Sequence, residues 1–155
     1  MKKFKTLSLT LLICLVGVMA SCGKKNECQN IIYDTCSLLD EVSNKVEKVN
    51  TLEEFEAIDY QSLFDNNRFK NIPDDCKNAA ISEQEKEDLK ESLIKTFDIL
   101  FKKIGALTVG TFPEEILNQQ ADQIKAALTT ACNNLETYGD FENFQSEVVK
   151  AISPL

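Results

Sequence analysis

Apolar side chains recur at alternating spacings of four and three along most of this chain, which is the spacing of one face of an α-helix. Three segments carry long stripes of this kind, at 28–49, 89–107 and 117–138. No stretch of useful length alternates between apolar and polar residues as a half-buried strand would. The pattern therefore predicts an all-α bundle of four or five helices, folded as one domain.

Local signals mark where two of the long helices begin. Ser82 precedes the second stripe and Glu85 follows three residues later, the spacing of a capping box in which each residue bonds the other's backbone. Thr111 and Glu114 have the same spacing ahead of the third stripe, with Pro113 at a position where a missing amide hydrogen is harmless. We therefore expect both helices to begin with a side-chain cap.

The remaining segments are shorter. Gly105 and Gly110 bracket a turn between the second and third stripes, so these two helices should run antiparallel. Short helices are expected at 51–60 and at 140–152. The segment 61–80 is rich in aspartate and asparagine but lacks the spacing of a calcium-binding EF-hand loop, so we interpret it as a surface loop.

The first 21 residues have the pattern of an export signal. Three lysines precede an apolar run at 7–20, which is too short to span a bilayer comfortably. The run ends in Met19-Ala20-Ser21-Cys22, which resembles the lipoprotein box of bacterial lipoproteins, although leucine is commoner than methionine at its first position. The alternative is an ordinary signal peptide cut near Ala20, which would leave Cys22 as a free thiol.

The resemblance to bacterial lipoproteins implies a lipid modification and a location. Cys22 would become the first residue of the mature chain, with diacylglycerol on its thiol and a fatty acyl chain such as palmitate on its amine. Residues 1–21 would be removed, 22–26 would form a short extended tether, and 27–155 would form the helical domain. The expected location is the bacterial cell envelope, with the outer membrane favoured over the inner one and the body outside the cytoplasm.

Four cysteines remain in the expected domain: Cys28, Cys36, Cys76 and Cys132. An even number in an exported chain points to disulfides that staple the bundle. Cys28 and Cys36 are about 12 Å apart along one helix and cannot bond each other. If the first helix begins at the same end as the second, the expected pairs are Cys28 with Cys76 and Cys36 with Cys132.

The net charge and the residue types present exclude several classes of function. Without the three signal lysines, 14 basic residues face 25 acidic ones, a net charge of −11, which disfavours nucleic acid as a partner. The chain has no histidine, which excludes histidine-dependent triads and makes a zinc site improbable, and we expect no metal and no cofactor. Ser92 and Lys95 match the Ser-x-x-Lys nucleophile motif of penicillin-recognising enzymes, but the companion motifs are absent. We therefore expect no enzyme.

Two classes of function remain. The first is a helical binding or assembly module that contacts an envelope protein while Cys22 holds it on the membrane. The second is an inhibitor or immunity protein that neutralises a cationic enzyme or toxin. Acidic residues gathered beside exposed aromatics such as Tyr60, Phe64 or Phe69 would favour a single binding face. A carrier for a small apolar ligand between the helices is a third possibility.

Overall fold

The computed structural model describes residues 23–59 and 72–152, and these residues form a helical bundle. The elements are α2 (Gly23–Lys48), α3 (Leu52–Glu56), α5 (Glu83–Leu107), α6 (Glu114–Asn133), the short 3-10 helix η2 (Tyr138–Asp140) and α7 (Phe141–Ile152). Extended backbone pairing within the described ranges is limited to one isolated antiparallel bridge between Ala80 and Thr137. The all-α prediction is confirmed.

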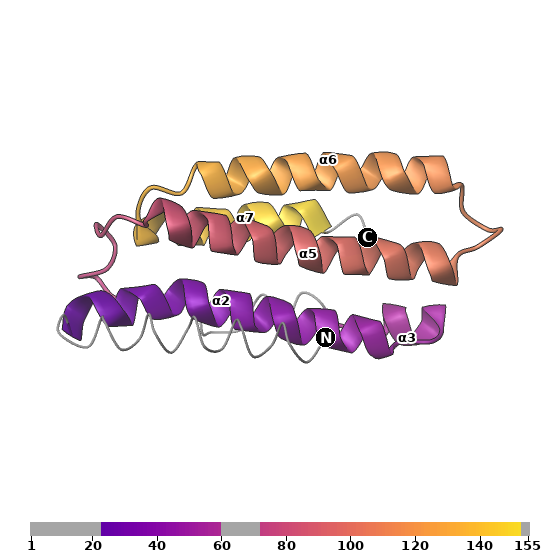
Figure 1. Cartoon of the computed structure of the whole chain (residues 1–155), viewed down its shortest axis with the longest axis horizontal. Coiled ribbons are helices and arrows are strands. Elements are labelled where there is room, and N and C mark those ends of the chain that lie inside the picture. Colours follow the sequence, from indigo (N-terminus) through magenta and orange to yellow (C-terminus); the bar gives the residue numbers. More distant parts are fainter. Residues whose placement is uncertain (1–22, 60–71, 153–155) are drawn as a thin grey trace.

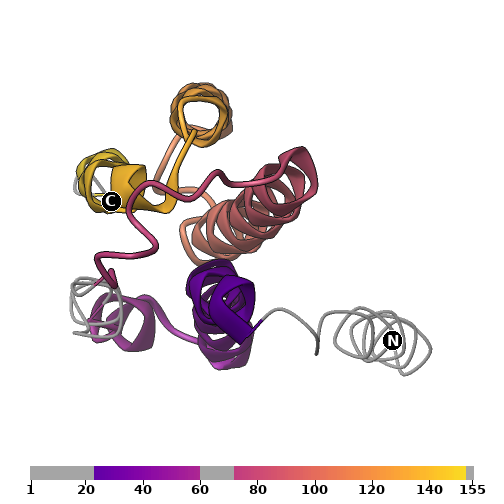
Figure 2. The same ribbon diagram turned by 90° about the vertical axis from the view of Figure 1, so that its left-hand side faces the viewer.

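The long helices lie side by side, with α5 between α2 and α6 (Figures 1 and 2). Both α2 and α5 begin at the left-hand end of Figure 1, where α6 ends and α7 begins. The helices α5 and α6 are therefore antiparallel, as the sequence predicted. We call the end where α2 and α5 begin the disulfide end, and the opposite end, with α3 and the α5–α6 turn, the distal end.

The predicted stripes form the core between the helices. Leu39 and Val42 of α2 and Leu89, Leu93 and Phe97 of α5 are at most 1% exposed. Removing such side chains from water contributes about 1.5–3 kcal/mol each, before the entropy of ordering the chain is counted. The stripes therefore act as the packing seams of the bundle.

Two polar side chains lie inside the seam between α2 and α5. Ser43 and Thr96 are 6% and 2% exposed, and their hydroxyl oxygens are 3.1 Å apart. The Ser43 hydroxyl also donates to the Leu39 carbonyl at 3.0 Å, and the Thr96 hydroxyl to the Ser92 carbonyl at 2.9 Å. Because buried hydroxyls are costly when unpaired, this pair favours one register of α2 against α5.

The start of α5 is secured by the predicted capping box. The Glu85 amide donates to the Ser82 hydroxyl at 3.2 Å, and the Ser82 amide donates to the Glu85 carboxylate at 2.8 Å. The second carboxylate oxygen of Glu85 accepts a hydrogen bond from the hydroxyl of Tyr138, a buried residue of η2. Burial, followed by this contact with Glu85, raises the pKa of the Tyr138 phenol. One carboxylate thus joins the start of α5 to the connection between α6 and α7.

The predicted capping box of α6 is not formed. The helix begins at Glu114 after Pro113, without a side-chain cap, and the Thr111 hydroxyl donates instead to the Thr108 carbonyl at 2.9 Å. Gly110 explains the difference, because its φ of 79° bends the chain back at 108–111 and leaves Thr111 in the turn. Helix α5 also continues through Gly105, which the sequence analysis had placed at the edge of the turn.

One end of each of two other predicted segments differs from the prediction. Helix α2 begins at Gly23, so 23–26 forms its first turn and is not an extended tether. Helix α6 ends at Asn133, so Leu135 and Tyr138 are buried as predicted but lie beyond the helix. Of the predicted loop at 61–80, residues 74–78 form turns, and 61–71 lie outside the described residues.

Candidate binding surface

The disulfide end holds one covalent cross-link. Cys28 in α2 and Cys76 in the segment before α5 are bonded, with an S–S distance of 2.00 Å and a Cα–Cα distance of 5.5 Å. Their side chains are 6% and 1% exposed. The first predicted pair is confirmed, and so is the direction of α2 from which it was argued.

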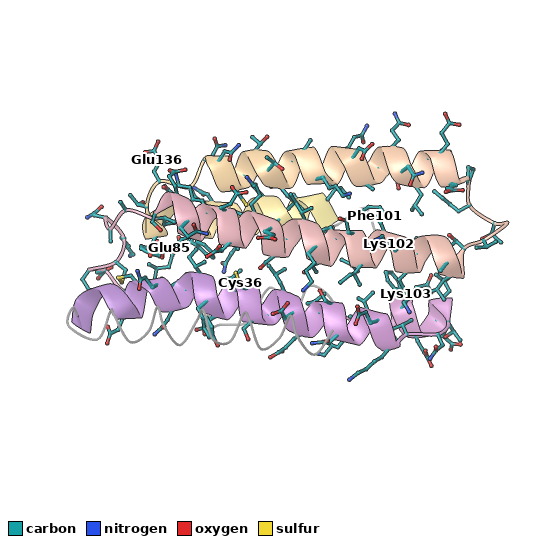
Figure 3. The ribbon with its side chains drawn as sticks, viewed as in Figure 1. Cys36, Glu85, Phe101, Lys102, Lys103 and Glu136 are labelled. Atoms are coloured by element: carbon teal, nitrogen blue, oxygen red, sulfur yellow. A yellow bond between two sulfur atoms is a disulfide. The ribbon has the colours of Figure 1, made fainter. Side chains whose placement is uncertain are left out.

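The second predicted pair is not bonded in this structure, where Cys36 and Cys132 are free thiols. Cys36 lies on α2 and Cys132 on α6, and these two helices pack on α5 rather than closely on each other. Figure 3 labels Cys36 between α2 and α5. Cys36 lies near the middle of α2, whereas Cys132 is the second-last residue of α6.

Both free thiols ionise less readily than an exposed cysteine. Burial raises the pKa of the Cys36 thiol, although a hydrogen bond with Ser92 acts in the opposite direction. Burial raises the pKa of the Cys132 thiol to about 12, and the charge of Cys36 adds to this shift. A thiol must ionise to attack or to bind a metal, and burial disfavours this ionisation at both cysteines.

The two residues of the Ser-x-x-Lys match each contact a side chain of α2. Ser92 is half-buried and bonds toward Cys36. Lys95 is exposed on α5, and its ammonium lies 3.8 Å from the carboxylate of Asp40 on α2. Each member of the motif therefore has a partner on α2.

Within the described residues, acidic side chains occur on every long helix. Several are paired with lysines one turn away, such as Glu83 with Lys86 at 3.0 Å and Glu147 with Lys150 at 3.1 Å. Tyr60, Phe64 and Phe69, the aromatics that the sequence analysis singled out, lie outside the described residues. Charge alone therefore does not identify a binding face.

Exposed apolar side chains are less evenly distributed. Five large ones are exposed among the described residues: Tyr33, Leu52, Val109, Phe112 and Ile116. Three of them fall within 109–116, at the α5–α6 turn, and Leu52 belongs to α3 at the same distal end (Figure 1). We call Val109, Phe112 and Ile116 the apolar tip. The sequence analysis did not predict this tip, although Val109 and Phe112 are large apolar residues that lie between the second and third stripes and belong to neither.

In 23–59 and 72–152, no group of three or more cysteine, aspartate or glutamate side chains is arranged to hold a metal ion. The helices within those same ranges include none that is long and apolar enough to cross a membrane. Comparison with protein-family models, with curated proteins and with solved structures found no match to this chain.

Proposed function

We propose that this protein is a lipid-anchored component of the bacterial cell envelope that acts as a non-enzymatic helical binding or assembly module. The observation that carries the proposal is the position of the apolar tip relative to the lipoprotein box. Cys22 directly precedes α2, which begins at the disulfide end, whereas the apolar tip is at the distal end. A lipid on Cys22 would keep the disulfide end at the membrane and present the tip to other proteins.

The dimensions of the bundle support this arrangement. Helix α2 has 26 residues, which corresponds to a length of about 39 Å. Because α2 starts one residue after Cys22, little chain would separate the lipid from the folded body. Two or three acyl chains, at about 0.8 kcal/mol for each buried methylene, would make dissociation from the bilayer negligible.

The body itself favours binding over catalysis. The chain has no histidine, and the two free thiols have raised pKa values. The side chains of the Ser-x-x-Lys match engage groups on α2. What remains for function is the surface, of which the apolar tip is the most distinctive part.

Lipidation is tested by metabolic labelling with a radioactive or clickable fatty acid. The Cys22→Ser variant should lose the label and appear as uncleaved precursor or released protein. Cys14→Ser, which changes the other cysteine of the signal segment, is the matched control and should keep it. Label that persists in the Cys22→Ser variant would show that the lipoprotein interpretation is wrong.

The binding role is tested by native gel electrophoresis of mildly solubilised envelopes. The full 155-residue chain has a mass of 17.4 kDa, and the mature protein, which is smaller, should migrate in a complex well above that mass. Migration only as a single chain would count against an assembly module.

The second candidate function is an inhibitor or immunity protein, favoured by the mature net charge of −11. A strongly acidic surface attracts a cationic enzyme over long range, and salt weakens that attraction. Under this alternative, the complex would contain one basic enzyme or toxin whose activity is lost on binding. A partner without catalytic activity would favour the assembly module.

A further inference from the structure

Three of the five large apolar side chains that are exposed among the described residues belong to the apolar tip. Val109 is 79% exposed, Phe112 44% and Ile116 45%. Apolar side chains scattered singly over a surface are ordinary, whereas a local group of them marks a site of interaction. These three are spaced three and four residues apart along the chain, at the point where α5 turns into α6.

The backbone of the tip is held in place by its own hydrogen bonds. The Thr108 carbonyl accepts from the amide of Thr111 at 3.0 Å and from that of Phe112 at 3.2 Å. Beneath the turn, α5 and α6 come close, since a β-carbon on Gly105 would lie 3.3 Å from the Leu117 side chain. The apolar side chains are thus presented by an ordered turn, which lowers the entropy lost when a partner binds.

The charged residues next to the tip in the chain are acidic. Glu114 and Glu115 are both exposed, and they are the charged residues of the segment 104–120. The rest of the distal end carries charges of both signs, with exposed glutamates on α3 and exposed lysines on α2 and α5: Glu53, Glu56, Lys45, Lys48 and Lys102. An apolar group beside Glu114 and Glu115 is complementary to apolar side chains flanked by lysine or arginine.

Lys103, near the end of α5, is directed away from Glu114 and Glu115. The Lys103 ammonium donates to the carbonyl of Glu47 at 3.0 Å and to that of Val49 at 2.8 Å, where α2 ends. Figure 3 shows Lys103 on the side of α5 that faces α2 and α3, away from α6. Its charge therefore stabilises the end of α2, a helix C-terminus, and does not neutralise Glu114 and Glu115.

We propose that the apolar tip, with Glu114 and Glu115, is the docking surface for a basic amphipathic segment of an envelope protein. The proposal rests on the binding function proposed above and specifies its surface and the chemistry of its partner. A lipid bilayer is a poorer occupant, because anionic headgroups repel Glu114 and Glu115. A second copy of the chain is also poorer, because two tips would bring their glutamates together.

The test is photo-crosslinking in living cells with the full-length protein. The photoreactive residue p-benzoylphenylalanine replaces Phe112, and in parallel Tyr33, which is 52% exposed on α2 and serves as the control position. Adducts are identified by mass spectrometry of the crosslinked peptides. We expect an adduct at position 112 to a protein segment with lysine or arginine close to apolar residues, and none at position 33.

A second variant tests the role of charge. Glu114→Gln combined with Glu115→Gln should lower the yield of the adduct at position 112 at least threefold, because both complementary charges are lost. The matched control is Asp34→Asn combined with Glu41→Gln, two exposed acidic residues of α2, which should leave the yield within a factor of 1.5. Circular dichroism of the purified variants checks that the helices remain folded.

Several results would overturn the proposal, and they separate it from the binding function on which it rests. A protein adduct at position 33 but not at position 112 would keep the binding function and reject the tip. A phospholipid adduct at position 112 would assign the tip to the membrane, and an adduct to this same chain would assign it to self-association. No adduct at either position, combined with migration as a single chain on native gels, would reject both proposals.

Discussion

The Cys28–Cys76 bridge should contribute a large part of the stability of this bundle. It closes a loop with a sequence separation of 48. In the chain-entropy model, a loop of this size lowers the entropy of the unfolded chain enough to stabilise the fold by about 4 kcal/mol. Because domains of this size are stable by only about 5–15 kcal/mol, losing the bridge should bring the protein near its unfolding limit.

The variant that tests this combines Cys28→Ala with Cys76→Ala. We expect a loss of about 4 kcal/mol in the free energy of unfolding, together with a melting temperature lower by roughly 15 °C. The urea m-value should increase, because the unfolded chain without the cross-link exposes more surface. Urea unfolding followed by circular dichroism measures the free energy and the m-value in one experiment.

The matched control combines Cys36→Ala with Cys132→Ala, which removes the two free thiols. It should lose about 1–2 kcal/mol, through packing alone, and its m-value should not change. Equal losses in the two double variants would refute the reasoning from loop closure. A rise in the m-value of the control would show that Cys36 and Cys132 are bonded in the protein after all.

Three further predictions follow from individual contacts. Burial raises the pKa of Cys132 to about 12, so in the folded protein this thiol should react with iodoacetamide at pH 8 more slowly than the less buried Cys36. In urea both thiols should react at the same rate, and mass spectrometry of the labelled peptides measures both rates. Backbone hydrogen bonds from Thr137, then from Glu136, lower the pKa of the Asp140 carboxyl. The ionised carboxylate therefore stabilises the folded protein above about pH 4, and this stabilisation is lost as the pH falls through the lower pKa of the folded state. The stability difference between the wild type and Asp140→Asn should therefore shrink between pH 6 and pH 2.5 in urea titrations, and a constant difference would contradict this assignment. Thr96→Val should destabilise the fold by about 1–2 kcal/mol, because it leaves the buried Ser43 hydroxyl with one partner fewer; an unchanged urea midpoint would show that the pair does not matter.

Much of the helical architecture was already determined by the local sequence. The stripe from Cys28 to Val49 is buried where it was predicted, because a helix repeats every 3.6 residues whatever lies against it. The capping box of Ser82 and Glu85 formed as predicted, since it needs only residues three apart in the chain. The pairing of Cys28 with Cys76 followed from the direction of α2 and the reach of a disulfide.

Other features were decided by the tertiary structure. Thr111 has the spacing of a helix cap, but Gly110 has a left-handed backbone conformation, and Thr111 lies in the turn, where its hydroxyl bonds the Thr108 carbonyl. Cys36 and Cys132 were predicted to bond, yet α5 lies between the helices that carry them. Sequence spacing shows which helices carry two cysteines, but it contains no information about the lateral order of those helices in the bundle.

The apolar tip shows most clearly which features the sequence determines and which the tertiary structure determines. The sequence identifies Val109, Phe112 and Ile116 as apolar, but apolar residues near a helix end are equally compatible with a buried cap and with an exposed patch. Exposure depends on whether another element covers the turn, which is a property of the packed bundle. The sequence thus determined which residues form helices and which of their faces pack together, and the tertiary structure determined which apolar residues were left on the surface.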